Sequence, residues 1–448
     1  MKVENQGRGN WGSRLGFVLA AAGSAIGLGN IWGFPTQVGL NGGAVFVLVY
    51  LCCVLLIAVP VMIAEITVGR SAKSDPVGAF KNLAPDSAWK WVGVLGVVTG
   101  LVILSYYSVL AGWTLHYIWM TLSGTFQGLS GPEVSGVFSE FVANGPYAIL
   151  LHFLFIVLTV WVVTGGIQGG IERVTTILMP VLLVILLLLV FRSVTLPGAA
   201  VGIEYYLRPD FSKLSMQVVL SALGQAFFSM SLGMGAMITY GSYLSRRENI
   251  VSSAAYVSAA DVFVAFLAGF AIFPALFAVQ GLAPDAGPGL IYIVLPNIFN
   301  QIPFGQLFGT AFYLLLAIAA LTSAISLLEV VVAYLIDQRG IPRGKAAMGV
   351  GAAAFLLGIP SALGNGYIAM FSGFLDRADF IFGKVSLVIG ALLLCLFISW
   401  KWGISNALEE VESENRSFRL RTVWTVLIRF VCPIAILAIL IQNVMELF

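Results

Sequence analysis

Glycine, serine and asparagine interrupt an apolar run at residues 23–30, which read Gly-Ser-Ala-Ile-Gly-Leu-Gly-Asn. Each glycine costs about 1 kcal/mol relative to alanine inside a helix, and Pro35 adds a second break shortly afterwards. Within a membrane, an unwound segment is tolerated only where it is buried in protein or lines a cavity. Its carbonyl oxygens can then bind a cation, and the positive N-terminus of the following half-helix can face an anion. Close helix packing through small residues is the alternative.

A second interruption of the same kind lies in another apolar run, at residues 229–235. Two broken spans at corresponding positions of two halves are typical of a transporter site. The pairing therefore disfavours simple packing as the reason for the first interruption. The residues that interrupt the second run are Ser229, Ser231, Gly233 and Gly235.

Three further polar residues lie within apolar segments. Asp261 is ionisable, and such a residue inside a membrane span is by default a candidate functional site. Its alternative role is a helix-end carboxylate capped by backbone amides. Thr322 and Ser323 carry oxygen atoms of the kind that hard cations prefer. The alternative for both hydroxyls is a hydrogen bond back to their own helix.

The composition indicates the class of protein. The chain has 448 residues, of which 59% are hydrophobic and 10% charged, and its mean hydropathy is +0.97. This is typical of a polytopic helical membrane protein. The net charge of +2 is uninformative, and nothing in the sequence suggests a nucleic-acid partner. An enzyme is the least favoured class, because no nucleophile–base pair or metal cluster is evident and the four cysteines lie in apolar runs.

Hydropathy predicts eleven spans of about 20 residues each, the length that a bilayer core requires. The interrupted spans are the first and the sixth, so each half contains five spans and the two halves are inverted in the membrane. We predict repeats at residues 1–200 and 201–403, followed by a peripheral eleventh span within residues 404–448. The predicted spans are residues 11–40, 43–70, 91–122, 147–164, 171–194, 216–244, 250–279, 309–337, 344–363, 380–402 and 422–445.

Positive charge predicts the orientation. Lysine and arginine are frequent in the N-terminal segment and in alternate loops, whereas the opposite loops hold only Arg192, Arg208, Lys213 and Arg377. Positively charged loops stay in the cytoplasm. The N-terminus is therefore expected to be cytoplasmic, and the C-terminus extracellular, in a multi-pass protein of the cell (inner) membrane.

Several motifs together resemble the neurotransmitter:sodium symporter family in its bacterial amino-acid branch. They are Gly-Leu-Gly-Asn at 27–30, Phe34-Pro35, Asn-Gly-Gly at 41–43, Pro-Asp-Phe-Ser-Lys-Leu at 209–214, the run 225–243 and Leu-Thr-Ser at 321–323. Within this branch, the chain resembles the eleven-helix transporters of multiple hydrophobic amino acids. This resemblance implies an all-α LeuT fold. The rule on paired broken spans was itself formulated on members of this family.

The resemblance implies two bound sodium ions, held by oxygen atoms alone. Chloride-dependent animal members need an anion near the position of Asp261, where most of the family carries an amide. Asp261 can supply that negative charge itself, so no chloride requirement is expected. It can also take up a proton when sodium leaves, which predicts proton counter-transport. The expected ligands are Gly23, Ile26, Ala319, Thr322 and Ser323 for one ion, and Ala25, Asn30, Ser229, Asp261 and the substrate carboxylate for the other.

The resemblance also implies a substrate pocket. Gly27 stands where monoamine transporters of the family have an aspartate for the ligand amine, which favours a ligand with its own carboxylate. Tyr107 matches the tyrosine that hydrogen-bonds this carboxylate. Met234 is flexible and suits varied side chains, although core packing is its alternative. The predicted substrate is a hydrophobic L-amino acid, and the predicted substrate residues are Ser24, Ala25, Gly27, Leu28, Gly29, Ile103, Tyr107, Phe228, Ser229, Ser231, Met234, Ser323 and Leu327.

Gate residues of the family also have counterparts in this sequence. On the cytoplasmic side they are Arg8, Trp11, Tyr243 and Asp337, with Arg8 and Asp337 as an ion pair, and on the outside Asp379.

Gly33 replaces the usual arginine partner of the outer acid, which puts an extracellular salt bridge in doubt. Arg377 is a poor substitute, because residues two apart do not face each other on a helix. Gly170 and Pro180 reproduce a Gly-x9-Pro pattern that lets a helix unwind in related transporters. Glu65 resembles a carboxylate that binds the unwound backbone of the sixth span.

These features predict a sodium-coupled secondary active importer that works by alternating access within the lipid membrane. One alternative is a symporter of an osmolyte such as betaine or proline, which is disfavoured because Phe228 is the main aromatic residue of the slot. An ion channel or ligand sensor on the same fold is an alternative from another class. The clustering of polar residues at one depth disfavours a channel. The sequence leaves open the rank order of amino acids, the ion stoichiometry and the oligomeric state.

Overall fold

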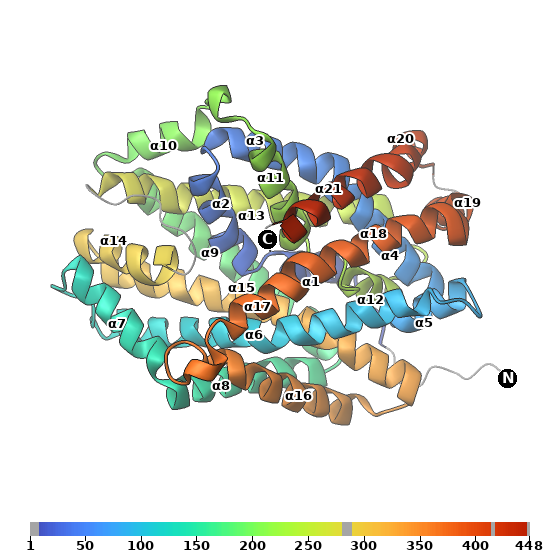
Figure 1. Cartoon of the computed structure of the whole chain (residues 1–448), viewed down its shortest axis with the longest axis horizontal. Helices are drawn as coiled ribbons and strands as arrows, with labels where there is room; N and C mark the ends of the chain where they lie inside the picture. The colour runs from blue at the N-terminus through green and yellow to red at the C-terminus, as the bar shows by residue number, and fades with distance from the viewer. Residues whose placement is uncertain (1–8, 280–288, 414–416, 446–448) are drawn as a thin grey trace.

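The computed structural model describes residues 9–279, 289–413 and 417–445. Every element of these described residues is a helix, with no strand among them. Figure 1 shows long helices that run across the molecule between two ends. This confirms the predicted all-α fold. Short helices gather at the two ends: α7 (Gly131–Ala143), α10 (Ala199–Leu207) and α14 (Leu295–Gln301) at the left of Figure 1, and α5 (Pro76–Leu83) and α19 (Ile404–Val411) at the right.

Nine helical stretches within the described residues are long and apolar enough to cross a membrane. They correspond to predicted spans two to five and seven to eleven, which confirms a multi-pass architecture. Their bounds are Ala44–Ala72, Lys90–Leu122 (α6), Gly145–Thr164 (α8), Ile167–Val194, Ile250–Ala278 (α13), Gly305–Arg339 (α15), Arg343–Leu363 (α16), Ala369–Val411 and Arg421–Met445.

Four of these stretches are composite, because π-turns or 3-10 turns interrupt the α-helical pattern. The first contains α3 (Ala44–Cys53), η2 (Val54–Ala58) and α4 (Val59–Ala72), and the second η3 (Ile167–Glu172) and α9 (Arg173–Val194). The third contains η6 (Ala369–Phe371), α17 (Phe374–Ala378), η7 (Asp379–Ser386), α18 (Leu387–Leu396), η8 (Phe397–Gly403) and α19, and the fourth α20 (Arg421–Val426), η9 (Leu427–Val431) and α21 (Cys432–Met445).

The first span is broken where glycine and serine accumulate. Helix α1 (Arg14–Ala25) ends one residue before Ile26, whose backbone is extended at φ −74° and ψ 95°. The chain resumes in η1 (Gly29–Gly33) and α2 (Phe34–Leu40) after a bend of 52°. The predicted interruption within residues 23–30 is confirmed.

The sixth span is divided as well, into α11 (Met216–Ser229) and α12 (Ala236–Ser242). Between them, Ser231, Gly233 and Gly235 have φ of 53°, 85° and 78°. Glycine tolerates this left-handed region, whereas other residues adopt it rarely. A Cβ on Gly233 would clash with the carbonyl oxygen of Leu387, so close packing also requires glycine here.

Several segments expected to be loops are helical. Residues 123–146 contain α7, which is fixed by a capping box between Ser130 and Glu133. The connection to the sixth span contains α10, and the one to the eighth contains η5 (Leu290–Val294) and α14. The tenth span continues past residue 402 into α19 after Gly403, whose φ is 97°. These helices are short or only partly apolar, so a hydropathy window of membrane length does not detect them.

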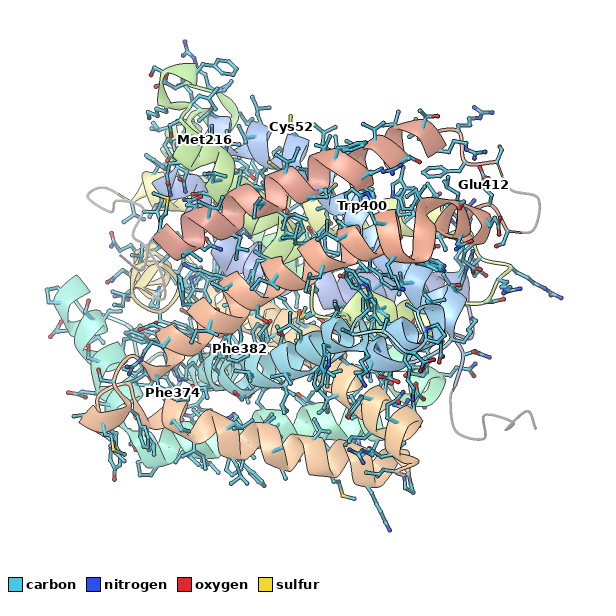
Figure 2. All side chains as sticks on the ribbon, turned by 45° about the vertical axis from the view of Figure 1, so that its right-hand side comes forward. Cys52, Met216, Phe374, Phe382, Trp400 and Glu412 are labelled. Atoms are coloured by element: carbon cyan, nitrogen blue, oxygen red, sulfur yellow. The ribbon has the colours of Figure 1, made fainter. Side chains whose placement is uncertain are left out.

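The flanks of the bundle are apolar. Trp161 and Phe191 are 68% and 70% exposed, as expected for side chains that face lipid. Figure 2 shows Cys52 and Trp400 on such flanks, whereas the charged Glu412 lies at one end of the molecule.

Candidate functional site

A cavity of about 40 Å³ lies between the two broken spans. The unwound segments contribute its polar atoms, and α6 and α15 contribute most of its remaining wall. All the predicted substrate residues except Ser229 line it, together with Leu387, which the sequence did not indicate. The lining residues are Ser24, Ala25, Gly27, Leu28, Gly29, Ile103, Tyr107, Phe228, Ser231, Met234, Ser323, Leu327 and Leu387.

The polar side of the cavity is built around Gly27. A Cβ on Gly27 would clash with the Ser323 hydroxyl and lie 3.0 Å from the Tyr107 hydroxyl. The Leu28 amide donates to the Tyr107 oxygen at 3.3 Å. An aspartate at position 27 would therefore not fit without displacing these groups. The Tyr107 hydroxyl lies at this wall of the cavity and is a group of the kind that can donate to a carboxylate brought by a ligand.

Asp261 lies beside this cavity, on α13, and is fully buried. Its Oδ1 accepts a hydrogen bond from Asn30 Nδ2 at 2.7 Å, and both its carboxylate oxygens accept from Ser229 Oγ at 3.1 Å. Tyr50 donates to Oδ2 at 3.3 Å. Within the described residues, no lysine, arginine or histidine pairs with Asp261. Sequence reasoning found Asn30, Ser229 and Asp261 but missed Tyr50, which stands in an apolar run without distinguishing neighbours.

A second group of oxygen atoms lies where α15 passes α1. Ser323 Oγ donates to the carbonyl oxygens of Ser24 at 3.1 Å and Gly23 at 3.4 Å. Thr322 Oγ1 donates to the carbonyl oxygens of Ala319 at 3.0 Å and Ile318 at 3.2 Å. These are hydrogen bonds to its own helix, the alternative role expected for this hydroxyl. A Cβ on Gly23 would lie only 3.1 Å from Thr322 Cβ, so glycine allows the two helices to meet here.

Both groups fit sodium by their donor chemistry. They offer hydroxyl, amide and carbonyl oxygens with at most one carboxylate, which suits a hard monovalent cation. No cluster of three or more histidine, cysteine, aspartate or glutamate side chains suited to a metal occurs in the described residues.

Aromatic and charged residues pack together at the positions predicted for the cytoplasmic gate. Trp11 Nε1 donates to the Tyr240 carbonyl at 2.9 Å, and the Trp11 ring packs edge-on against Tyr240 and Tyr243. Tyr243 donates to Glu329 at 2.7 Å. Arg343 binds the two oxygens of this fully buried carboxylate at 2.7 and 2.9 Å.

Sequence reasoning missed the Glu329–Arg343 pair. The rule that flagged Asp261, an ionisable group within a span, would also have found Glu329. Arg8 lies outside the described residues, so the predicted Arg8–Asp337 pair stays a prediction. Asp337 accepts from the Asp75 amide at 2.7 Å, and burial raises the pKa of the Asp75 carboxyl despite a hydrogen bond from Gln338.

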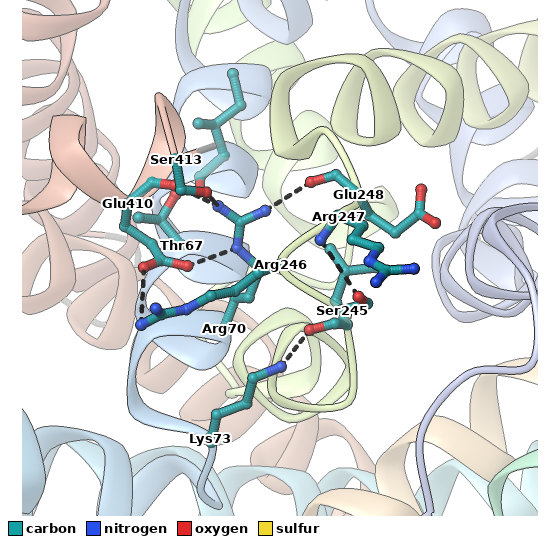
Figure 3. Close-up of polar contacts among 11 residues, drawn as sticks. Thr67, Arg70, Lys73, Ser245, Arg246, Arg247, Glu248, Glu410 and Ser413 are labelled. Atoms are coloured by element: carbon teal, nitrogen blue, oxygen red, sulfur yellow. Dashed lines mark hydrogen bonds and ion pairs between the residues drawn. The ribbon is translucent and has the colours of Figure 1, made fainter. Parts of the chain in front are cut away.

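A buried ionic junction, here named the Arg70 cluster, lies at the same end of the molecule (Figure 3). Arg70 is fully buried and its Nε binds Glu410 Oε1 at 2.6 Å. It also donates to the Glu248 carbonyl at 2.6 Å and to Ser413 Oγ at 2.9 Å. The neighbouring Lys73 bonds the Leu244 carbonyl. The cluster joins the end of α4, the loop after α12 and α19.

The residues at the predicted outer gate differ from the family pattern. Asp379 accepts a hydrogen bond from Tyr106 at 2.9 Å. Arg377 instead donates to the carbonyls of Gly373 and Ser372, at 3.1 and 2.6 Å, so it does not replace the missing gate arginine. At Gly33, a Cβ would lie 3.4 Å from Gln225 Oε1, and Gln225 Nε2 donates to the Gly29 carbonyl at 2.9 Å. The side-chain amide of Gln225, on α11, therefore bonds the unwound first span next to Gly33.

Two further family positions have defined places. Glu65 Oε1 accepts from the Gly233 amide at 2.6 Å, so this carboxylate does hold the unwound sixth span. Gly170 lies in η3 and Pro180 inside α9, and both elements are wound in this structure. Glu172, beside Gly170, accepts from the Gly12 amide at 2.7 Å and so links this region to the start of α1.

A helical membrane protein with two broken spans around a small cavity, oxygen groups beside it and closed gates has the architecture of a secondary transporter. The model of the sodium:neurotransmitter symporter family matches residues 8–128 and 137–448, and the chain belongs to this family. It is therefore a sodium-dependent membrane transporter and not an enzyme.

Individual relatives agree. The chain is 42% identical over 437 residues to the uncharacterized sodium-dependent transporter YhdH of Bacillus subtilis, covering 96% of this chain and 97% of the relative. It is 36% identical to an uncharacterized sodium-dependent transporter of Haemophilus influenzae, covering 99% and 100%. The crystal structure of MhsT in complex with L-phenylalanine superposes with a TM-score of 0.89 at 45% identity, covering 98% and 100%. This likeness confirms the LeuT fold.

Proposed function

We propose that the protein is a sodium-coupled symporter that imports hydrophobic L-amino acids by alternating access. The observation that carries the proposal is the buried Asp261, which only neutral side chains contact within the described residues. An ionised carboxylate is costly to bury unless a cation pairs with it. Sodium entering from outside meets that need beside the cavity. Each net charge that moves inward across 100 mV adds about 2.3 kcal/mol of driving force.

The substrate class follows from the shape of the cavity. Gly27, Tyr107 and the Leu28 amide bind the carboxylate, and carbonyls of the unwound segments bind the ammonium group. Ile103, Met234 and Leu327 accept the apolar side chain. Tyr107 and Phe228 are the only aromatic residues of the lining, which is not the aromatic box of a quaternary ammonium site. The similarity to MhsT, solved with L-phenylalanine, supports this class.

Two sodium ions take part. Asn30, Ser229, Asp261, the Ala25 carbonyl and the substrate carboxylate hold one, so that substrate and ion bind together. The other ion is held by the predicted second set: Gly23, Ile26, Ala319, Thr322 and Ser323.

Asp261 also makes transport independent of chloride. Its negative charge offsets that of the adjacent sodium, which is the task of an anion in chloride-dependent relatives. When sodium leaves toward the cytoplasm, Asp261 takes up a proton and the empty carrier returns. Sodium–proton exchange then accompanies amino-acid uptake.

Alternating access uses the two closed sides in turn. The repeats at residues 1–200 and 201–403 are inverted, residues 404–448 add a peripheral span, and the N-terminus is cytoplasmic. On the outside, Phe228 and Leu387 are the two described residues that line both the cavity and a vestibule of about 450 Å³. On the cytoplasmic side, Trp11, Tyr243 and Glu329 must separate, while Gly170 and Pro180 let the fifth span unwind.

Thermal stability of the purified protein with each of the twenty amino acids, in sodium and in potassium, tests this function. We expect leucine, phenylalanine and other bulky apolar L-amino acids to raise the melting temperature in sodium only. Tryptamine and tyramine, which lack the carboxylate, should have no effect. Equal stabilisation in potassium, or by the amines, would contradict the proposal.

A further inference from the structure

Leu387 occupies a boundary that, among the residues the structure describes, only one other side chain shares. It is 2% exposed, begins α18 directly after η7, and lines both the cavity and the vestibule. Phe228, at the end of α11, is the other residue common to the two linings. Leu387 therefore separates the space beside the broken helices from the outside.

The backbone of Leu387 is fixed against the unwound sixth span. A Cβ on Gly233 would clash with the Leu387 carbonyl oxygen, and a Cβ on Gly390 would clash with the Gly233 carbonyl oxygen. The two chains thus pack backbone to backbone, which only glycine permits. This close packing leaves no room for a side chain between α18 and the unwound segment and prevents the two from approaching further.

A second contact holds the same position from α6. The hydroxyl of Ser386, the residue before Leu387, hydrogen-bonds the Thr99 hydroxyl, and both side chains are buried. Thr99 lies one turn from Ile103, which lines the cavity. Leu387 is therefore flanked by a close backbone contact with the sixth span and by a hydrogen bond to α6, near the Ile103 wall. Met234, in contrast, is a flexible side chain that can adapt to a ligand.

We propose that Leu387 is a specificity-determining residue: its side chain forms the outer wall of the substrate cavity and sets the largest amino-acid side chain that can be occluded. This inference rests on the proposed function of the cavity. A wall held by such contacts rejects ligands by size, whereas an adaptable wall accepts them. Truncating Leu387 opens the cavity toward the vestibule, and enlarging it shortens the cavity.

Competition binding with valine, leucine, phenylalanine and tryptophan, in sodium, tests the proposal on the full-length purified protein. We expect Leu387→Ala to weaken the binding of leucine and valine about tenfold, because apolar contact is lost. The affinity for tryptophan should change much less or improve. Leu387→Phe should keep the affinity for valine and lower the affinity for tryptophan about tenfold or more. Leu220→Ala is the matched control, since Leu220 lines the vestibule alone and the same atoms are removed. It should leave the rank order unchanged.

The outcomes separate this inference from the proposed function. If the wild type binds no amino acid in sodium, the proposed function itself fails. If the wild type binds with sodium dependence but both Leu387 variants keep its rank order, the role of Leu387 is overturned. Should Leu387→Ala fail to fold, Leu387→Met keeps the volume and adds flexibility. It is expected to bring the affinities for leucine and tryptophan closer together, and an unchanged ratio would contradict the proposal.

Discussion

Glu410 and Asp261 are both buried carboxylates, but their surroundings differ. Glu410 is paired with Arg70, whose other donors are used by Glu248 and Ser413. Asp261 receives only hydrogen bonds from Asn30, Ser229 and Tyr50 among the described residues. The protein supplies a permanent cation at the first site and neutral donors at the second. The difference indicates that Glu410 holds the fold together, whereas Asp261 serves a cation that enters and leaves.

The largest expected effect is the loss of stability caused by a substitution in the Arg70 cluster. Arg70→Ala removes the buried partner of Glu410, leaves it only the longer contact with the exposed Arg246, and should lower stability by about 3–5 kcal/mol. Thermal unfolding in detergent, with and without sodium, measures this loss, which should be the same in both. Arg246→Ala is the control, because Arg246 is 66% exposed and lies 4.0 Å from the same carboxylate. Exposed pairs contribute under about 1 kcal/mol, so equal losses in the two variants would refute the assignment.

At Asp261, in contrast, a substitution should change sodium affinity rather than stability. Asp261→Asn keeps the shape and removes the charge, so stability without sodium should hardly change. Sodium affinity should fall by about 2 kcal/mol, or roughly 30-fold. Titration of amino-acid binding with sodium checks this, and added chloride should partly restore the affinity. Wild-type sodium affinity in this variant would show that Asp261 is not a ligand.

A smaller effect is expected from pH. Protons and sodium compete for the Asp261 oxygens, so sodium affinity should fall as the pH falls, by at most about tenfold per pH unit. The measurement is a sodium titration at several values between about pH 8 and pH 5.5. The dependence should vanish in Asp261→Asn. If it persisted there, another group would be responsible.

The smallest effect concerns Tyr50. Tyr50→Phe removes one hydrogen bond to Asp261 and should weaken sodium binding by roughly threefold to tenfold. Tyr106→Phe is a suitable control, because it removes a buried hydroxyl that bonds Asp379 instead. Its sodium affinity should match the wild type. If the two variants had the same sodium affinity, Tyr50 would not belong to the site.

The sequence predicted the features that depend on local chemistry. Glycines and serines within apolar runs located both helix breaks, because those residues are costly in a membrane helix. Family motifs then indicated nearly the whole lining of the cavity.

Contacts between residues far apart in the chain could not be predicted from local sequence patterns. Arg70 and Glu410 are 340 positions apart, and each lies beside a stretch that could face water. Nothing distinguishes Leu387 from the other leucines of its apolar run. Its role depends on a backbone contact with Gly233 that only the folded chain reveals.

Uptake of radiolabelled L-leucine and L-phenylalanine into proteoliposomes tests the central claim most directly, namely that sodium at Asp261 drives amino-acid transport. The vesicles contain potassium gluconate and are diluted into sodium gluconate, so that chloride is absent on both sides. The account predicts that the wild type accumulates the amino acid above the equilibrium level. This accumulation should collapse when sodium is replaced by potassium, and uptake by the Asp261→Asn variant should be slower. Accumulation that is the same in potassium, or that requires chloride in the wild type, would contradict it.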